Sequence, residues 1–370
     1  NKRSANSRTI LALSIALVMF FTGCAKTPQT LRYDVETEET VIWPLPPEQP
    51  RFQYVGELTG ETNFEDATDD KSFSESMGDF FRWLVGLGSP GAKPRVLQRP
   101  QTGAIDANGR VLVTDVSRRS VMVFNGAEGK LDEWKMATGE LEFHTPVGIA
   151  VGENGRIYVA DAQRGFVVIL NEKGDPVGQF GNDALKRPTG LARDADRKQL
   201  YVADTHSHDI KIFNDDGELL DVIGRQGVAS GEFNSPTHLA FANGNLYVTD
   251  TFNTRVQVLT RDGDVSHEFG RRGLYVGNLI RPKGVTTDSE GNIYVIESYA
   301  DYLLVYNAKG EFLLPIGGTG AGIGQFYLPS GVWSDDNDRI YIADMFNGRI
   351  VVLQYMGGRG AKQVTPISLK

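Results

Sequence analysis

Residues 236–270 read PTHLAFANGNLYVTDTFNTRVQVLTRDGDVSHEFG. Four segments rich in apolar and β-branched residues alternate in it with polar turns, which include Asn-Gly at 243–244 and Asp-Gly at 262–263. Such turn residues between short apolar segments are typical of β-hairpins. The stretch therefore predicts one four-stranded antiparallel sheet.

Five other stretches of the chain align with this one from its proline onward. The likeness is clearest over the first two strands, as in PVGIAVGENGRIYVAD (146–161) and PKGVTTDSEGNIYVIE (282–297). Four short strands repeated six times indicate the blades of a β-propeller. The prolines that begin the repeats recur about every 46 residues, at Pro100, Pro146, Pro188, Pro236, Pro282 and Pro329.

The repeat resembles that of the NHL family, which includes an Asp-x-x-Asn-x-Arg hairpin. This motif stands here at 250–255 and again at 344–349. The resemblance covers about residues 100–355 and implies an all-β fold with six blades. We accordingly expect the propeller over residues 100–356, followed by a C-terminal tail over residues 357–370.

The sixth repeat has no fourth strand of its own, because QYMGGRGAKQV (354–364) lacks the apolar segment and final glycine that end the other repeats. RFQYVGEL at 51–58 carries a pattern of that kind far upstream. We predict that residues 51–59 complete the last blade, since ring closure removes two exposed sheet edges.

Residues 60–99 form an insertion between this closing strand and the first blade. Ser72 and Glu75 are spaced as a helix capping box. The segment predicts a short amphipathic helix docked on the propeller, with contact to a membrane surface as the alternative. Its apolar face would comprise Phe73, Met77, Phe80, Phe81, Leu84 and Val85.

The N-terminal residues have the features of an export signal. Residues 2–8 are basic and acid-free, and residues 10–21 form an apolar run too short to span a bilayer comfortably. The Thr22-Gly23-Cys24 that follows resembles a bacterial lipobox, which implies a lipoprotein signal peptide over residues 1–23 and lipidation of Cys24. The alternative is an ordinary signal peptide followed by a buried free cysteine.

Residues 24–50 are first acidic and then rich in proline, without a sustained helix or strand period. We therefore expect an extended tether between the membrane and the propeller. Together these segments predict an exported protein held to the membrane by its N-terminal lipid. Because Ala25 rather than aspartate follows the cysteine, the lipoprotein resemblance implies the outer membrane.

The net charge disfavours one class of partner. It is −9 for the whole chain and more negative once residues 1–23 are removed. An acidic chain repels the phosphates of nucleic acid, so we expect no nucleic-acid partner.

The loops that lead into the first strands contrast with this overall charge. Nine basic and four acidic residues lie in them, whereas the turns expected at the opposite face are mostly acidic. The basic residues are Lys93, Arg95, Arg99, Lys186, Arg187, Arg225, Arg271, Arg272 and Arg281. An arginine-rich face predicts docking of an envelope protein, an anionic glycan or another anionic ligand. The candidate binding residues are Arg99, Arg187, Arg225, Arg271 and Arg272.

One acidic residue ends the second strand of every repeat. A residue present in all six repeats is most simply a turn device that accepts backbone N–H bonds, or pairs with Arg255 and Arg349 in its own hairpin. We therefore predict no catalytic residue among them. They are Asp115, Asp161, Asp204, Asp250, Glu297 and Asp344.

Three histidines depart from the repeat pattern. His238 stands where most repeats have glycine, at the expected channel mouth, and His206 and His208 lie in the hairpin of the preceding repeat. Histidines on one rim are ligands suited to zinc or another divalent ion, although turn histidines without metal are commoner. Peptide-amidating lyases resemble this propeller and carry such a zinc site. The favoured function is thus a binding or scaffold module without a cofactor, and the alternative is a metal-dependent lyase or hydrolase.

Substitution of Cys24 tests the lipobox. In a bacterial host that expresses the full chain, we expect Cys24→Ser to abolish incorporation of labelled fatty acid and to release the protein from the membrane fraction. Unchanged labelling of the variant would contradict the assignment.

Overall fold

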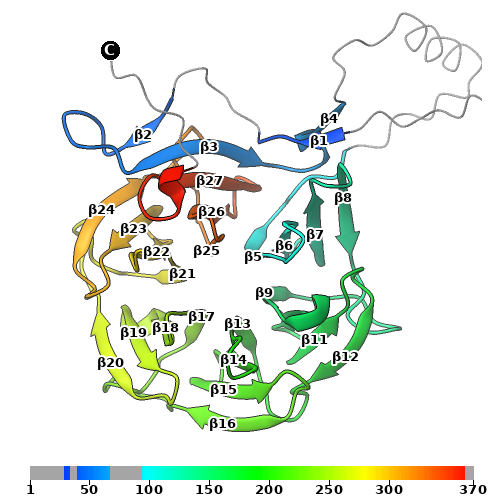
Figure 1. Ribbon diagram of the computed structural model, residues 1–370. Helices are drawn as coiled ribbons and strands as arrows, with labels where there is room; N and C mark the ends of the chain where they lie inside the picture. Colours follow the sequence, from blue (N-terminus) through cyan, green and yellow to red (C-terminus); the bar gives the residue numbers. More distant parts are fainter. Residues whose placement is uncertain (1–28, 34–39, 67–93, 363–370) are drawn as a thin grey trace, which may run out of the picture.

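Six antiparallel sheets stand around a central axis as the blades of a propeller (Figure 1). The computed structural model describes residues 29–33, 40–66 and 94–362. Within these ranges helical structure is limited to the short 3₁₀ turns η1 (Glu61–Asn63), η2 (Glu153–Gly155), η3 (Thr251–Asn253) and η4 (Gly360–Lys362). The predicted all-β, six-bladed fold is confirmed. None of the helices in the described part is long and apolar enough to cross a membrane.

Blades 1 to 5 each contain four strands whose order from the channel outward follows the sequence. Their strands are β5 (Pro100–Ile105), β6 (Val111–Asp115), β7 (Ser120–Asn125) and β8 (Lys130–Trp134); β9 (Pro146–Val151), β10 (Ile157–Asp161), β11 (Phe166–Leu170) and β12 (Pro176–Phe180); β13 (Pro188–Asp194), β14 (Gln199–Asp204), β15 (Asp209–Asn214) and β16 (Leu219–Ile223); β17 (Pro236–Ala242), β18 (Asn245–Asp250), β19 (Arg255–Thr260) and β20 (Val265–Phe269); β21 (Pro282–Thr287), β22 (Ile293–Glu297), β23 (Tyr302–Tyr306) and β24 (Phe312–Gly317).

Blade 6 joins the two ends of the chain, as predicted. Its strands β25 (Val332–Ser334), β26 (Arg339–Asp344) and β27 (Arg349–Tyr355) are followed by β3 (Phe52–Leu58), which pairs antiparallel with β27. A buried ion pair fixes the junction, because Arg349 Nη1 lies 2.7 Å from Glu57 Oε1. The upstream strand thus closes the ring.

Part of the expected tether is instead attached to the propeller. β2 (Ile42–Trp43) adds a fifth strand outside β3, and β1 (Gln29–Leu31) pairs with β4 (Phe64–Asp66). Trp43 packs against the core cluster shared by blades 5 and 6, so burial of apolar surface holds this segment in place. Strands of two or three residues are too short to produce a visible period in the sequence.

Other N-terminal predictions concern segments outside the described residues. These are the signal peptide, Cys24 and the amphipathic helix expected within residues 60–99. At the ends of that insertion, β4 and the Gly60–Val96 bridge are in place.

The hydrophobic core lies between neighbouring blades. Between blades 1 and 2, for example, Leu112 and Val123 meet Ile157 and Val168 in one buried cluster. Because each sheet is covered on both faces, the middle strands β6 and β7 of blade 1 are buried at every position. Toward the axis the blades converge, and a Cβ on Gly148 would collide with the carbonyl of Thr189 in the next blade. Glycine is therefore required there.

The acidic residues that end the second strands hold the segments crossing from blade to blade. Asp161, for example, accepts the backbone N–H groups of His144 at 2.6 Å and Thr145 at 3.0 Å. Arg255 and Arg349 pair with the carboxylates of their own hairpins at 2.9 and 2.8 Å. The structural role predicted for these residues is confirmed.

Truncation tests ring closure. Removal of residues 1–59 deletes β3 and its buried Phe52 and Leu58, whereas removal of residues 1–48 deletes β2 but keeps β3. We expect the longer truncation to lower the melting temperature several times more than the shorter one. In the full chain, Phe52→Ala should cost about 3–5 kcal/mol, against almost nothing for Val177→Ala on the exposed side of β12. Equal melting temperatures for the two truncations, measured by circular dichroism, would contradict closure by β3.

Candidate functional site

A cavity of about 660 Å³ lies where the innermost strands begin, at one mouth of the central channel. Arg187, Arg281 and Lys283 line it, together with hydroxyl groups such as that of Thr237, and its lining contains no acidic residue. A neighbouring cavity shares Arg187 and adds Arg99, again without an acidic residue. We call Arg99, Arg187, Arg281 and Lys283 the cationic mouth.

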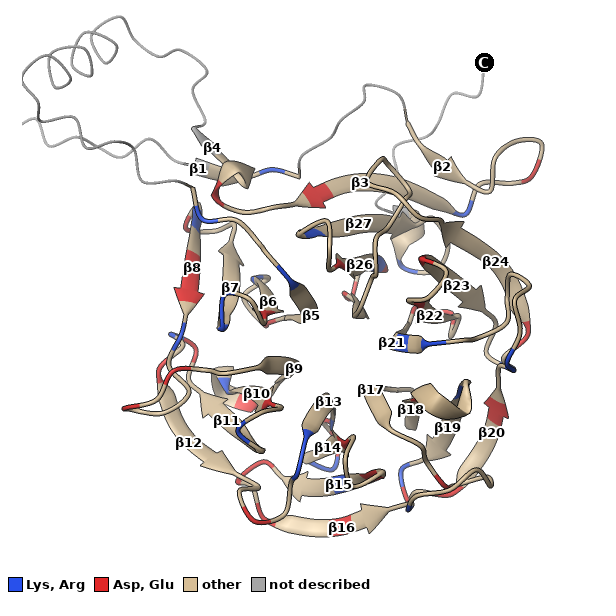
Figure 2. Ribbon diagram, turned by 180° about the vertical axis from the view of Figure 1, so that it is seen from behind, with Lys and Arg blue, Asp and Glu red and all other residues tan. Residues whose placement is uncertain are grey.

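The repeat itself places the three arginines of the cationic mouth. Each immediately precedes the first proline of its blade, in blades 1, 3 and 5, so that they alternate around the ring. The backbone N–H of each donates to the carboxylate that ends the second strand of its own blade: Arg99 to Asp115 at 3.0 Å, Arg187 to Asp204 at 2.8 Å and Arg281 to Glu297 at 3.0 Å. In Figure 2, Lys and Arg segments lead into β5, β13 and β21 on the inner side of the ring.

The side chains of the cationic mouth have no direct carboxylate partners, although buried carboxylates lie at the backbone of the three arginines. Across residues 29–33, 40–66 and 94–362, none of its four side chains forms an ion pair, and Arg99 instead lies over the ring of Phe346, 5.4 Å from its centroid. Burial lowers the pKa of Lys283, and the positive charges of Arg281 and Arg187 lower it further. The charged form of Lys283 is therefore disfavoured in the free protein, and an anion bound in the cavity would stabilise it.

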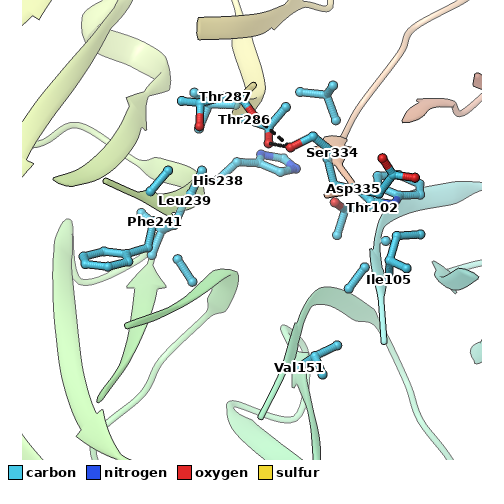
Figure 3. A pocket seen from close by; sticks show the side chains of 18 of the residues that line it. Thr102, Ile105, Val151, His238, Leu239, Phe241, Thr286, Thr287, Ser334 and Asp335 are labelled. Atoms are coloured by element: carbon cyan, nitrogen blue, oxygen red, sulfur yellow. Dashed lines mark hydrogen bonds between the residues drawn. The ribbon is translucent and has the colours of Figure 1, made fainter. Parts of the chain in front are cut away.

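His238 lies at the inner end of this cavity, deeper than the mouth position expected from the sequence. Its residue is 8% exposed, and the ring reaches from β17 into the channel (Figure 3). Nδ1 lies 3.2 Å from Thr237 Oγ1, whereas Nε2 is buried without a partner among the described residues. An unsatisfied buried acceptor costs about 1–3 kcal/mol. Burial, with a smaller contribution from Lys283, lowers the pKa of His238 from 6.5 to about 3, so the ring is neutral.

A second cavity of about 420 Å³ lies on the other side of His238. Its rim is acidic, with Asp288, Asp335, Asp336 and Asp338, so the two ends of the channel carry opposite charge. The C-terminal segment, expected as a tail, docks at this rim through Arg359, whose backbone N–H donates to Asp338 Oδ2 at 2.7 Å. The linings of the two cavities thus differ in charge, and the contrast expected between the two whole faces stays a prediction.

Three of the five predicted arginines lie away from the cationic mouth. Arg225 pairs with Glu232 at 2.9 Å, and Arg271 Nε donates to Asn278 Oδ1 at 3.1 Å. Arg272 is exposed in the same loop as Arg271. Only Arg99 and Arg187 of the predicted set are brought together.

The three predicted metal ligands do not converge. His206 and His238 line the same cavity, but His208 is engaged elsewhere, because its Nδ1 accepts the backbone N–H of Ser235 at 3.0 Å. The described part of the chain contains no group of three or more His, Cys, Asp or Glu side chains that could hold a metal ion. The cations Arg187, Arg281 and Lys283 line the same cavity as His238 and would repel a divalent metal ion, so these residues do not fit a metal site.

Sequence reasoning missed two members of this site. Arg281 is among the basic residues of the loops but not among the predicted binding residues, and Lys283 lies one residue past the proline that ends its loop. The sequence feature that points to the three arginines of this site is an arginine directly before the first proline in alternate repeats. Only a comparison of that one position across all six repeats would have shown it.

Comparisons with known proteins agree with this architecture. The NHL repeat family matches residues 143–170 and 185–213, and a family described as a 6-bladed beta-propeller matches residues 278–359. The chain is an NHL-repeat six-bladed β-propeller. No curated protein sequence matches it.

Solved structures with a similar fold have diverse activities. A virginiamycin B lyase from Staphylococcus aureus is 13% identical with a TM-score of 0.52, over 89% of this chain and 96% of the lyase. A gluconolactonase from Xanthomonas campestris is 18% identical with a TM-score of 0.53, over 71% and 90% of the two chains. An auxiliary nutrient binding protein from Bacteroides ovatus is 13% identical with a TM-score of 0.54, over 70% and 69%. At such identities the likeness shows the fold alone.

The buried neutral His238 predicts a pH dependence of stability. Its folded pKa of about 3 lies below the unfolded value, so the unfolded chain binds the extra proton and stability falls as the pH drops from about 6.5 toward 3. Between pH 7 and pH 5 this loss amounts to about 2 kcal/mol. Urea unfolding of the wild type should show it as a steeper pH dependence than that of His238→Phe. Identical pH dependences would contradict the buried neutral state.

Proposed function

We propose that this propeller is a binding module for an anionic ligand, which it receives at the cationic mouth. The observation that carries the proposal is the convergence of Arg187, Arg281 and Lys283 on one cavity whose lining contains no acidic residue. Arg187 and Lys283 are half-buried and Arg281 is exposed, and within the described residues none of the three side chains forms an ion pair. A half-buried cation without a carboxylate partner is unfavourable in the free protein. Such an arrangement is expected where a negative group of a ligand supplies the missing charge.

The site also has the chemistry to orient an anion. Arginine side chains offer paired N–H donors that match carboxylate or phosphate oxygens, and the lysine ammonium adds a compact charge. Because the backbone of each arginine is bound to a buried carboxylate, the segments that carry the charges are fixed before the ligand arrives. A preformed site loses less conformational entropy on binding.

The proposed setting is the bacterial envelope. The export signal and Cys24 would hold the propeller at the membrane, and the anionic group would belong to an envelope protein, a glycan or a smaller ligand. The acidic overall charge disfavours nucleic acid. Both binding proteins and enzymes occur among the structural neighbours, and the binding function needs no catalytic group or metal from this chain.

Inorganic phosphate provides a simple probe of the site. We expect saturable binding by calorimetry at constant ionic strength, together with a rise in melting temperature that follows the phosphate concentration. The double variant Arg187→Ala/Lys283→Met should weaken binding at least tenfold, because it removes two of the charges that line the cavity. Since the pKa of Lys283 is already lowered, binding should also weaken as the pH rises into the alkaline range.

The matched control is Arg225→Ala. Arg225 is equally charged but exposed and paired with Glu232, so its removal should change phosphate affinity less than twofold. Equal losses in the two variants, or no saturable binding by the wild type, would refute the cationic mouth as an anion site.

A further inference from the structure

We propose that the anionic ligand also carries an O–H or N–H donor, which hydrogen-bonds to Nε2 of His238 at the inner end of the cavity. The inference rests on the proposed function, because the anionic group is what brings the ligand to the cationic mouth. It narrows the ligand to hydroxylated or amide-bearing anions, such as phosphate esters or carboxylates of polyols.

The threonine hydroxyls around His238 determine which ring nitrogen carries the proton. Thr251 Oγ1 donates its only proton to the carbonyl of Pro282 at 2.9 Å. Thr237 Oγ1, 2.7 Å from Thr251 Oγ1, must therefore be the donor in that contact. With its proton committed, Thr237 can only accept from His238 Nδ1, at 3.2 Å. Nδ1 is consequently the protonated nitrogen.

Nε2 is then left with a free lone pair. The ring is neutral, since its pKa is about 3, and a neutral imidazole with a proton on Nδ1 has none on Nε2. Nε2 is buried and has no partner in the described part of the chain. An acceptor in this state selects for ligands with a donor and against analogues that lack one.

The position of His238 agrees with a role in ligand selection. It is the only described residue that lines both cavities of the channel. In four of the other five blades the equivalent residue is glycine, packed against the next blade: Gly148, Gly190, Gly284 and Gly331. His238 thus places a polar ring where the repeat otherwise leaves no side chain. His238 lines the same cavity as Arg187, Arg281 and Lys283.

Two phosphate esters of equal charge and chain length test the proposal. Calorimetry on the full chain should show glycerol 3-phosphate binding about tenfold more tightly than n-propyl phosphate, which lacks the hydroxyl groups. In His238→Phe the preference should fall to near one, while the affinities for n-propyl phosphate and inorganic phosphate are kept. His267→Phe, at a histidine of β20 that lines neither cavity, should retain the preference.

An NMR measurement on the wild type does not depend on the folding of a variant. Long-range ¹H–¹⁵N spectra should identify Nε2 of His238 as unprotonated, and glycerol 3-phosphate, unlike n-propyl phosphate, should shift that resonance. Equal wild-type affinities for the two esters, or a preference that survives in His238→Phe, would overturn the role of His238 while leaving the anion site intact. Absence of binding by both esters and by inorganic phosphate would overturn the anion site as well.

Discussion

Six buried carboxylates hold the segments that pass from one blade to the next, and the rest of the structure depends on them. Each receives one or two backbone N–H groups from the residues before an innermost strand; Asp204, for example, accepts those of Lys186 and Arg187. A buried carboxylate is tolerable because these donors replace its water. The same bonds fix the backbone of the three arginines at the channel mouth. The carboxylate–backbone bonds that recur in every blade therefore also hold the arginine-bearing segments of the proposed site in place.

The ring geometry explains why the channel is both narrow and specific. Innermost strands converge on the axis, so glycine is required where one blade meets the backbone of the next. Once β3 has closed the ring, every blade is held between two neighbours. Residues with a specific function are therefore expected where one repeat differs from the others. The alternating arginines, Lys283 and His238 are such differences, and they lie in one cavity or at its edge.

Much of the fold could be predicted because the same pattern of strands and turns recurs six times in the sequence. The closing strand was also predictable, since 51–58 keeps the apolar pattern of an outer strand. β2 was not, because two residues carry no period, and its place is set by the packing of Trp43 on a core formed by distant residues. At the site, charge counting found Arg99 and Arg187 but could not separate them from Arg225 and Arg271. Those two contact Glu232 and Asn278, each seven residues away within its own loop. His208 was misjudged because its ring substitutes for a carboxylate in binding a backbone amide.

Crystals soaked in selenate test directly whether the cationic mouth binds an anion. Selenate is a divalent oxyanion whose selenium atom can be located by its anomalous scattering, so its position can be read without assumptions about the ligand. We expect the strongest anomalous peak in the cavity lined by Arg187, Arg281 and Lys283. Peaks confined to the outer loops around Arg225 and Arg271, with that cavity empty at saturating selenate, would contradict it.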